Sequence, residues 1–296
     1  MQWSSVRSSR RTGGASGHPR GIAGPEHEAQ QSGDCCAYSA AITVSPTSNA
    51  TPFTEIVDPR PGGRVFEQRF RAGLGDAAPG GRVRLDAIGR WLQDIALADV
   101  EDAGYGDAAV WVARRMRICV NRFPQFGDTV TLRTFCSGLG RMWGERRTSL
   151  TGETADVETV ALWVHLDPDT LRPAPFAPGE LDDYTIASGG RQVRARLLHD
   201  PPPADAPREP WLFRATDLDL AGHVNNAAYW CLVEERLAGV ALQTIDAEIE
   251  FRSAAPPGEA SVQERGERLW VTGADGELHA SMITRLGPEP DPQSTV

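Results

Sequence analysis

The chain has 296 residues, 40% of them hydrophobic, and a formal net charge of −10 at pH 7. This length and apolar content suffice for one large domain or two ordinary ones with buried cores. All 30 basic residues are arginine, and they form no continuous basic run, so we expect no binding to nucleic acid, which requires clustered cations. No apolar run is long enough to cross a bilayer, so we expect no membrane span and a cytoplasmic location.

The cysteines do not indicate a disulfide or metal framework. They are odd in number and scattered, and none stands in a C-x-x-C pair. We therefore expect a chain that folds in a reducing compartment without a metal or another cofactor. The five positions are Cys35, Cys36, Cys119, Cys136 and Cys231.

The first predicted elements follow a tail that has no periodic apolar residues. Residues 1–58 are rich in Ser, Gly, Arg and Ala, a composition that predicts disorder. Val65–Ala72 is predicted to be a strand, and Asp86–Ala103 a helix with Asp86 as its N-cap, because apolar residues recur there at helical spacing. β-Branched and aromatic residues then predict four strands: Ala109–Arg122, Thr129–Phe135, Trp143–Leu150 and Val157–His165.

Prolines and glycines crowd residues 167–207, which favours an extended linker over a packed element. After it we predict a strand at Glu209–Ala215, a helix from about Val224 to Gly239, and a second disordered tail at 287–296. Four further strands are predicted between that helix and the tail: Leu242–Arg252, Ala260–Glu264, Leu269–Thr272 and Leu278–Leu286.

The order of strand, helix and run of strands therefore occurs twice, once in residues 59–166 and again in residues 208–286. Such an order is typical of an α+β fold in which one antiparallel sheet wraps a single helix. The sequence thus predicts two domains of the same architecture in tandem.

One segment, Thr216–Tyr229, combines the residue types of an acyl-transfer site. It places Asp219 and His223 on the loop that enters the second predicted helix, where unpaired backbone amides and the positive end of the helix dipole gather. Amides near residues 222–225 could polarise a thioester carbonyl, while the carboxylate deprotonates water or attacks the carbonyl itself. Gly222 lets the backbone turn tightly.

The pattern D-x-D-x-x-G-H-V-N-N-x-x-Y at residues 217–229 resembles the hot dog thioesterases, specifically the acyl-ACP thioesterases of plants and their bacterial relatives. Three stretches of the first half resemble the same family in the same order: Arg115-Met116, residues 121–128 and residues 137–142. The resemblance covers about residues 64–286. It implies two tandem hot dog folds that form a pseudo-dimeric monomer, with a homodimer as an open alternative. It also implies hydrolysis of fatty acyl thioesters carried by the acyl-carrier protein (ACP) or by CoA.

The resemblance also assigns roles to residues. Asp219 and His223 match the catalytic aspartate and histidine of the family, and Asn225 is a third candidate catalytic residue. The expected substrate-binding residues are Gly222, Val224 and Asn226. The asparagine, glutamate and cysteine of the plant pattern are replaced by Ala221, Ala254 and Ala255. We therefore favour a reduced mechanism, in which an aspartate acts with helix amides.

Other interpretations stay open. Asp219 could hold a turn, His223 could pack against the backbone, and Asn225 and Asn226 could be helix caps. The three alanines are compatible with a non-catalytic acyl-thioester binding protein or sensor, and a hot dog dehydratase or hydratase is a further hypothesis. The chain has no G-x-S-x-G motif, which excludes the α/β-hydrolase route to thioester cleavage.

Several side chains outside the motif are secondary candidates. Glu235 is a distant candidate for a second carboxylate, whereas Cys231 is expected to be a small core residue. Seven arginines on or beside the predicted strands could gather into a basic patch for an acidic carrier protein or a CoA phosphate, although a solvated strand face is the favoured explanation. These are Arg114, Arg115, Arg117, Arg122, Arg141, Arg146 and Arg147.

Overall fold

The structure is a computed structural model that describes residues 53–105, 110–176, 179, 181–240 and 244–287. Its first half contains β1 (Phe66–Arg71), α1 (Leu85–Asp102), β2 (Val110–Arg122), β3 (Thr129–Leu139), β4 (Trp143–Thr151) and β5 (Asp156–Leu166). Its second half contains α2 (Asp182–Ser188), β6 (Arg208–Phe213), α3 (Trp230–Arg236), β7 (Ile245–Phe251), β8 (Gly258–Arg265), β9 (Arg268–Gly273) and β10 (Leu278–Leu286). Short 3-10 turns are η1 (Leu74–Asp76), η2 (Ala215–Asp217) and η3 (Asn226–Tyr229). Every strand range predicted from the sequence overlaps one of these strands, except that positions 109, 242 and 243 lie outside the described residues.

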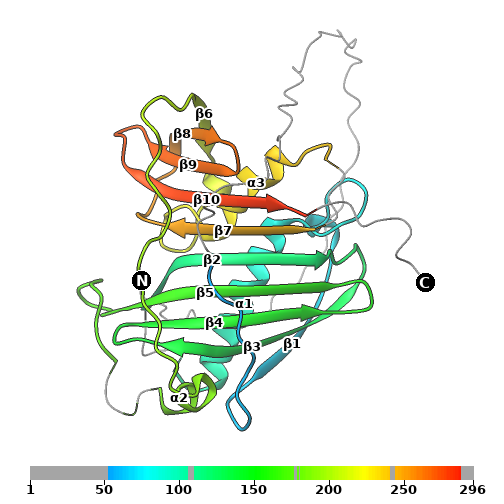
Figure 1. The fold of residues 1–296 in the computed structure, drawn as a ribbon, viewed down its shortest axis with the longest axis vertical. Helices are drawn as coiled ribbons and strands as arrows, with labels where there is room; N and C mark the ends of the chain where they lie inside the picture. Colours follow the sequence, from blue (N-terminus) through cyan, green and yellow to red (C-terminus); the bar gives the residue numbers. More distant parts are fainter. Residues whose placement is uncertain (1–52, 106–109, 177–178, 180, 241–243, 288–296) are drawn as a thin grey trace, which may run out of the picture.

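The strands form one ten-stranded sheet in the order β1-β3-β4-β5-β2-β7-β10-β9-β8-β6, in which the described pairs are antiparallel (Figure 1). The order within the second half repeats that of the first half, reflected across the contact between β2 and β7. That contact pairs Arg115 with Glu250 at one end and Val120 with Ile245 at the other. The two halves are therefore joined edge to edge through the backbone.

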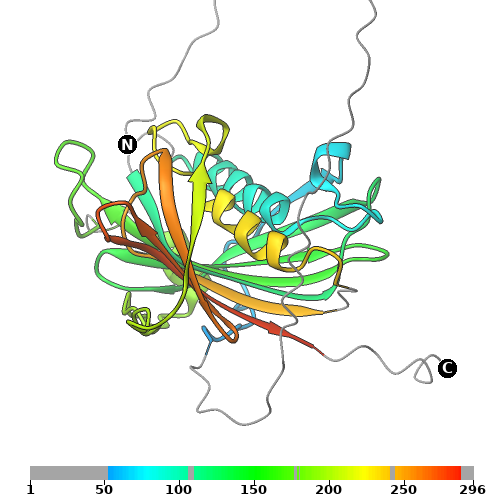
Figure 2. The same ribbon diagram turned by 90° about the horizontal axis from the view of Figure 1, so that it is seen from above.

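The helix α1 and the helical segment formed by η3 and α3 lie side by side on the concave face of the sheet (Figure 2). The periodic apolar residues of α1 bury against this face, since Ile88 and Ile95 are fully buried and Leu92 nearly so. On α3, Trp230 is fully buried in the same core. The core of the protein is consequently continuous between the two halves.

The start of α1 differs from the prediction. Asp86 is not the N-cap: the helix begins one residue earlier, at Leu85, and no side chain of the capping residue Arg84 closes it. Asp86 is instead buried and forms ion pairs with Arg84 and Arg90. The Leu85 amide donates to the carboxylate of Glu234 on α3, so a residue of the second half caps the helix of the first.

The helix of the second half is shorter than predicted. The range Val224–Gly239 was expected, but the helical segment runs from η3 at Asn226 to the end of α3 at Arg236. Local hydrogen bonds explain its late start, because Asn225 accepts from the Ala227 amide and so caps the first turn.

The proline-rich segment 167–207, expected to be extended, contains the short helix α2. Tyr184 and Ala187 of this helix are buried against Cys136 of β3, and the Tyr184 hydroxyl donates to Asp99 at 3.1 Å. The apolar residues Leu181, Tyr184 and Ala187 recur at three-residue spacing, a local helical signal that the surrounding prolines obscured. The domain limits inferred from the sequence stay a prediction.

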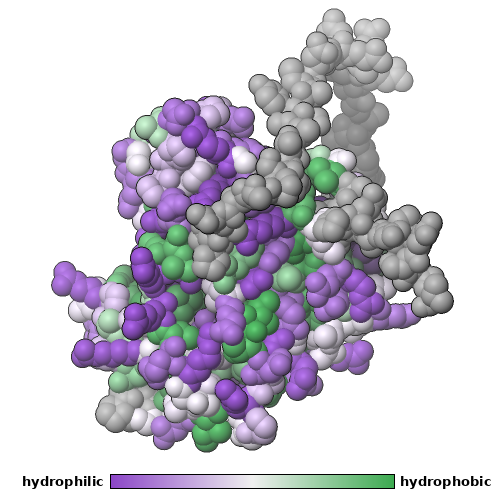
Figure 3. All heavy atoms as spheres, viewed as in Figure 1, coloured by the Kyte–Doolittle hydropathy of each residue, from purple (hydrophilic) through white to green (hydrophobic). Residues whose placement is uncertain are grey.

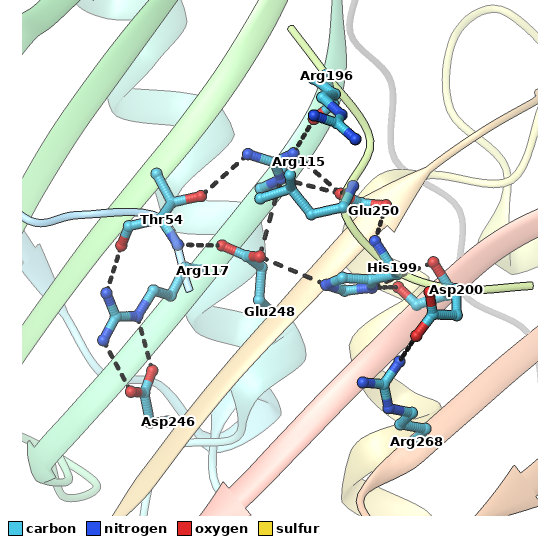
Figure 4. Close-up of polar contacts among 12 residues, drawn as sticks. Thr54, Arg115, Arg117, Arg196, His199, Asp200, Asp246, Glu248, Glu250 and Arg268 are labelled. Atoms are coloured by element: carbon cyan, nitrogen blue, oxygen red, sulfur yellow. Dashed lines mark hydrogen bonds and ion pairs between the residues drawn. The ribbon is translucent and has the colours of Figure 1, made fainter. Parts of the chain in front are cut away.

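The outer face of the sheet, opposite the helices, mixes hydrophilic residues with smaller apolar areas (Figure 3). Along the contact between β2 and β7 it carries an ionic network (Figure 4). Arg115 forms a buried pair with Glu250 at 2.9 Å, and Arg117 forms a partly exposed pair with Asp246 at 2.8 Å. Residues 53–58, which we had assigned to the disordered tail, lie along this face, and the Thr54 amide donates to Glu248 at 2.9 Å. Thr54 therefore ties this segment to the junction of the two halves.

Candidate active site

The segment that carries the motif forms a compact loop between β6 and η3. Leu218 and Val224 form an antiparallel bridge, and the Asp219 amide donates to the His223 carbonyl at 2.9 Å. Gly222 closes the turn with a φ of +75°, a conformation that glycine adopts without strain. The sequence thus folds this loop locally.

The Asp219 carboxylate stabilises this loop through one of its two oxygens. Oδ1 accepts from the Ala221 amide at 2.8 Å and from the His223 amide at 3.4 Å. Among the residues that the structure describes, none bonds Oδ2. The half-buried carboxylate therefore has a fixed orientation and one oxygen available for water.

His223 lies in the same loop, but its side chain is exposed. Its backbone contributes both the carbonyl that receives the Asp219 amide and an amide directed at Asp219 Oδ1. The structure thus brings His223 and Asp219 together through the backbone of the loop.

Asn225 connects the loop to the first half of the chain. Its Oδ1 accepts from the Ala227 amide and from Gln93 Nε2 of α1, both at 2.8 Å. Gln93 was missed in the sequence, where the only signal was a polar residue between Leu92 and Ile95 on the buried side of α1. The candidate site is consequently built from both halves.

The expected oxyanion donors are already occupied, so that prediction was wrong. The Gly222 amide donates to the Asp219 carbonyl, the Val224 amide to Ala255 and the Asn225 amide to Asp217, while the His223 amide faces Asp219 Oδ1. The loop uses these amides to close itself, which a sequence motif cannot show. Over the described part of the chain, no acceptor bonds the Asn226 amide.

The remaining predicted residues lie close by. Val224 is buried in the core, whereas Asn226 begins η3 and is partly buried. Glu235 is exposed on α3, whereas its neighbour Glu234 bonds the Leu85 amide of α1. Among the described residues, no hydrogen bond or ion pair joins Glu235 to the loop.

A cavity of about 640 Å³ lies next to the loop. Its wall includes Phe213 and Ala255, and the Ala255 carbonyl accepts from the Val224 amide at 2.9 Å. The Phe213 ring also packs 5.3 Å from the ring of Tyr229, the last residue of the motif. Asp219 and His223 do not line this cavity themselves.

Most arginines of the suggested basic patch are paired with carboxylates. Arg115 and Arg117 belong to the network of the outer face, Arg146 pairs with Asp99 at 2.6 Å, and Arg147 pairs with Glu158 at 2.8 Å. These four guanidinium groups are therefore largely neutralised by the fold.

Burial raises the pKa of the Cys231 thiol to about 11, with smaller contributions from nearby carboxylates. A thiol with such a pKa is protonated at neutral pH and is a poor nucleophile. Cys231 is therefore not a nucleophile, as predicted, but its side chain is partly exposed and lies at the edge of the core instead of inside it.

The geometry defines a class of protein: two halves, each a run of antiparallel strands curved around one helix, join edge to edge in a single ten-stranded sheet, with an Asp–His loop before the second helix. Family models agree with it in both halves. The model of the acyl-ACP thioesterase N-terminal domain matches residues 63–184, and that of the C-terminal domain matches residues 203–258. The chain belongs to the acyl-ACP thioesterase family, whose members are thioester hydrolases with tandem hot dog folds.

Relatives with similar sequences come from bacteria and plants. An uncharacterised protein of Mycobacterium tuberculosis (strain ATCC 25618 / H37Rv) is 28% identical over 205 residues, which cover 67% of this chain and 80% of the relative. The chloroplastic acyl-[acyl-carrier-protein] hydrolase FATB2 of Cuphea viscosissima is 29% identical over 252 residues, 76% of this chain and 59% of the relative. The chain thus spans little more than half the length of this plant relative.

Solved structures share the fold. An acyl-ACP thioesterase of Bacteroides thetaiotaomicron VPI-5482 has a TM-score of 0.64 at 18% identity, with 75% of this chain and 98% of the other covered. The 12:0-ACP thioesterase of Umbellularia californica has a TM-score of 0.61 at 19% identity, with coverages of 76% and 98%. These likenesses confirm the predicted tandem hot dog architecture. Within the described residues, no helix is long and apolar enough to cross a membrane.

Proposed function

We propose that this chain hydrolyses fatty acyl thioesters, carried by ACP or by CoA, to free fatty acids. Family membership across both halves supports the reaction class. The observation that carries the site assignment is Asp219, whose Oδ1 is held by two loop amides while Oδ2 has no partner among the described residues. A carboxylate fixed in this way suits a base.

In the proposed reaction, Asp219 Oδ2 takes a proton from water as the water oxygen attacks the thioester carbonyl carbon. The bond between carbonyl carbon and sulfur then breaks, and the sulfur leaves as a thiolate that takes up the proton held by Asp219, which restores the carboxylate. In the variant with the aspartate as nucleophile, Asp219 attacks the carbonyl carbon and the thiolate leaves, and water then hydrolyses the resulting acyl anhydride to free fatty acid and the Asp219 carboxylate.

Three further residues support this chemistry in the proposal. His223 orients the reacting groups beside Asp219, and Asn225 holds the loop against Gln93 of the first half. The Asn226 amide replaces residues 222–225 as the oxyanion donor, because those amides are engaged elsewhere. Gly222, Val224 and Asn226 remain the proposed substrate-binding residues.

The test is release of thiol from acyl-ACP and acyl-CoA substrates with acyl chains of different lengths. Asp219→Asn is expected to lower turnover by a factor of about 10²–10⁴, the usual contribution of a general base, without unfolding the protein. Asp217→Asn is the matched control, because among the described residues this carboxylate of the same loop accepts a hydrogen bond from the Arg214 amide alone. Full turnover in Asp219→Asn would remove the assignment.

A second candidate function is non-catalytic binding of acyl thioesters. It is favoured by the alanines at positions 221, 254 and 255, where side chains assigned to the plant reaction are missing. A wild-type protein that binds acyl-CoA or acyl-ACP but releases no thiol from either would support this function instead.

A further inference from the structure

The cavity of about 640 Å³ beside the candidate loop has an unusual combination of walls. Its apolar part includes Phe213, Ala255 and Pro256, whereas three carboxylates, Glu259, Asp275 and Glu277, are exposed along it. The residues described as lining it include no arginine. Such a cavity disfavours phosphates and carboxylates, since their charge would meet like charges.

One histidine, His279 of β10, is buried in the wall of this cavity. Its Nδ1 lies 2.8 Å from Ser253 Oγ, and the same Oγ lies 3.4 Å from the Leu278 carbonyl, which can only accept. Ser253 has a single proton to donate. Both contacts are satisfied together only when Ser253 donates to Leu278 and His279 Nδ1–H donates to Ser253.

In the neutral form of the ring, this arrangement leaves His279 Nε2 as a hydrogen-bond acceptor. None of the described residues bonds Nε2, which lies over Gly273 in the cavity wall. A Cβ at position 273 would stand only 2.6 Å from Nε2 and 2.8 Å from Asp275 Oδ1. Glycine at this position therefore keeps the space in front of the histidine open.

The cavity also adjoins the proposed reaction centre. Ala255, in its wall, bonds the amide of Val224, and Phe213 packs against Tyr229 of the motif. A substrate whose thioester lay at the Asp219 loop could therefore extend into it. The part of an ACP or CoA thioester next to the sulfur is the pantetheine arm, an uncharged chain with amide and hydroxyl groups that donate hydrogen bonds.

We propose that this cavity binds the uncharged pantetheine arm of the substrate, with His279 Nε2 accepting a hydrogen bond from an amide or hydroxyl of the arm. The proposal rests on the proposed thioester hydrolysis and adds a substrate subsite to it. His279 is the binding residue, and Ser253 is a positioning residue that holds the ring in the accepting tautomer.

Binding of two soluble probes tests the subsite without requiring turnover. S-methylpantetheine represents the arm alone and octanoate represents the acyl chain alone. His279→Asn keeps a polar group near the Nδ1 position for Ser253 but removes the Nε2 acceptor. It is expected to weaken binding of S-methylpantetheine about fivefold, the effect of one uncharged hydrogen bond, and to leave octanoate binding unchanged.

Two other variants separate this effect from altered folding. His279→Gln returns an acceptor close to the Nε2 position and is expected to retain most of the affinity. Ser281→Ala changes another serine beside a histidine, because Ser281 Oγ lies 3.2 Å from His199 Nδ1. Ser281 is not among the residues that line the cavity, so this variant should leave both affinities unchanged. Thermal unfolding of each variant shows whether it is folded.

The proposal is overturned if the wild-type protein does not bind S-methylpantetheine, if His279→Asn binds it as tightly as the wild type, or if that variant loses octanoate instead. The last result would assign the cavity to the acyl chain. Thiol release by the wild-type protein is measured separately, so a failure of the proposed hydrolysis is distinguished from a failure of the subsite.

Discussion

Glu234 joins the two halves of the protein at the start of α1. Its carboxylate accepts two hydrogen bonds from Arg82, at 2.9 and 2.6 Å, and one from the Leu85 amide at 2.7 Å. The side chains of Arg82 and Glu234 are only 18% and 10% exposed, so water screens the pair weakly. We expect Glu234→Ala to destabilise the fold through the loss of both contacts.

The magnitude follows from these contacts. Removing one partner of a buried ion pair costs about 3–5 kcal/mol, and partial exposure reduces this to about 2 kcal/mol here. Losing the cap on the Leu85 amide adds about 1 kcal/mol. The sum of about 3 kcal/mol corresponds to a fall in Tm of about 6–12 °C for a protein of this size.

Thermal unfolding followed by circular dichroism measures this fall. Glu235→Ala is the matched control, because this neighbouring carboxylate is exposed and should change stability by about 0.5 kcal/mol or less. A double-mutant cycle with Arg82→Ala isolates the coupling between the two side chains. If Glu234→Ala loses no more stability than Glu235→Ala, the contacts of Glu234 with Arg82 and Leu85 do not contribute to the stability of the fold.

Two further predictions concern the junction and the loop. Burial alone would raise the pKa of Glu248, but contacts with His199 and Thr54 outweigh burial and hold it below its ordinary value of 4.5. Its ionised form therefore stabilises the fold above that ordinary value, and this stability is lost as the pH falls through the lower folded-state pKa. In urea unfolding, the free energies of unfolding of the wild type and of Glu248→Gln should converge at acidic pH. A difference that stays constant with pH would contradict this. Gln93→Leu, which removes the bond to Asn225, should lower kcat/KM for thiol release about three- to tenfold with the fold intact, and an unchanged rate would show that the contact does not position the loop.

Local patterns explain why much of the fold could be predicted. The strand β10 was predicted with its observed limits, and β2 and β4 to within one residue. The residue types that favour a strand follow one another directly in the sequence, so they can be recognised without knowledge of the fold. Asp219, His223 and Asn225 were likewise identified in one short motif, and the structure brings them into one loop. Their catalytic roles stay a prediction.

The errors arose where local signals were weak or where long-range contacts decide. The helix α2 was hidden among prolines, and its partners are distant in the sequence: it packs against Cys136 of β3, and Tyr184 bonds Asp99 of α1. The amides of residues 222–225 looked available in the sequence, but the loop that they close depends on the Ala255 carbonyl of another segment. None of these partners can be read from spacing along the chain.

The sequence by itself determined the strands, the repeated order of elements and the loop that carries Asp219, because each depends on neighbours a few residues apart. Only the tertiary structure decided that β2 meets β7, that Gln93 reaches Asn225 and that Ser253 holds His279. The residues that these contacts join are between 26 and 135 positions apart in the sequence. Packing and hydrogen-bond geometry select such partners, and periodicity along the chain carries no record of them.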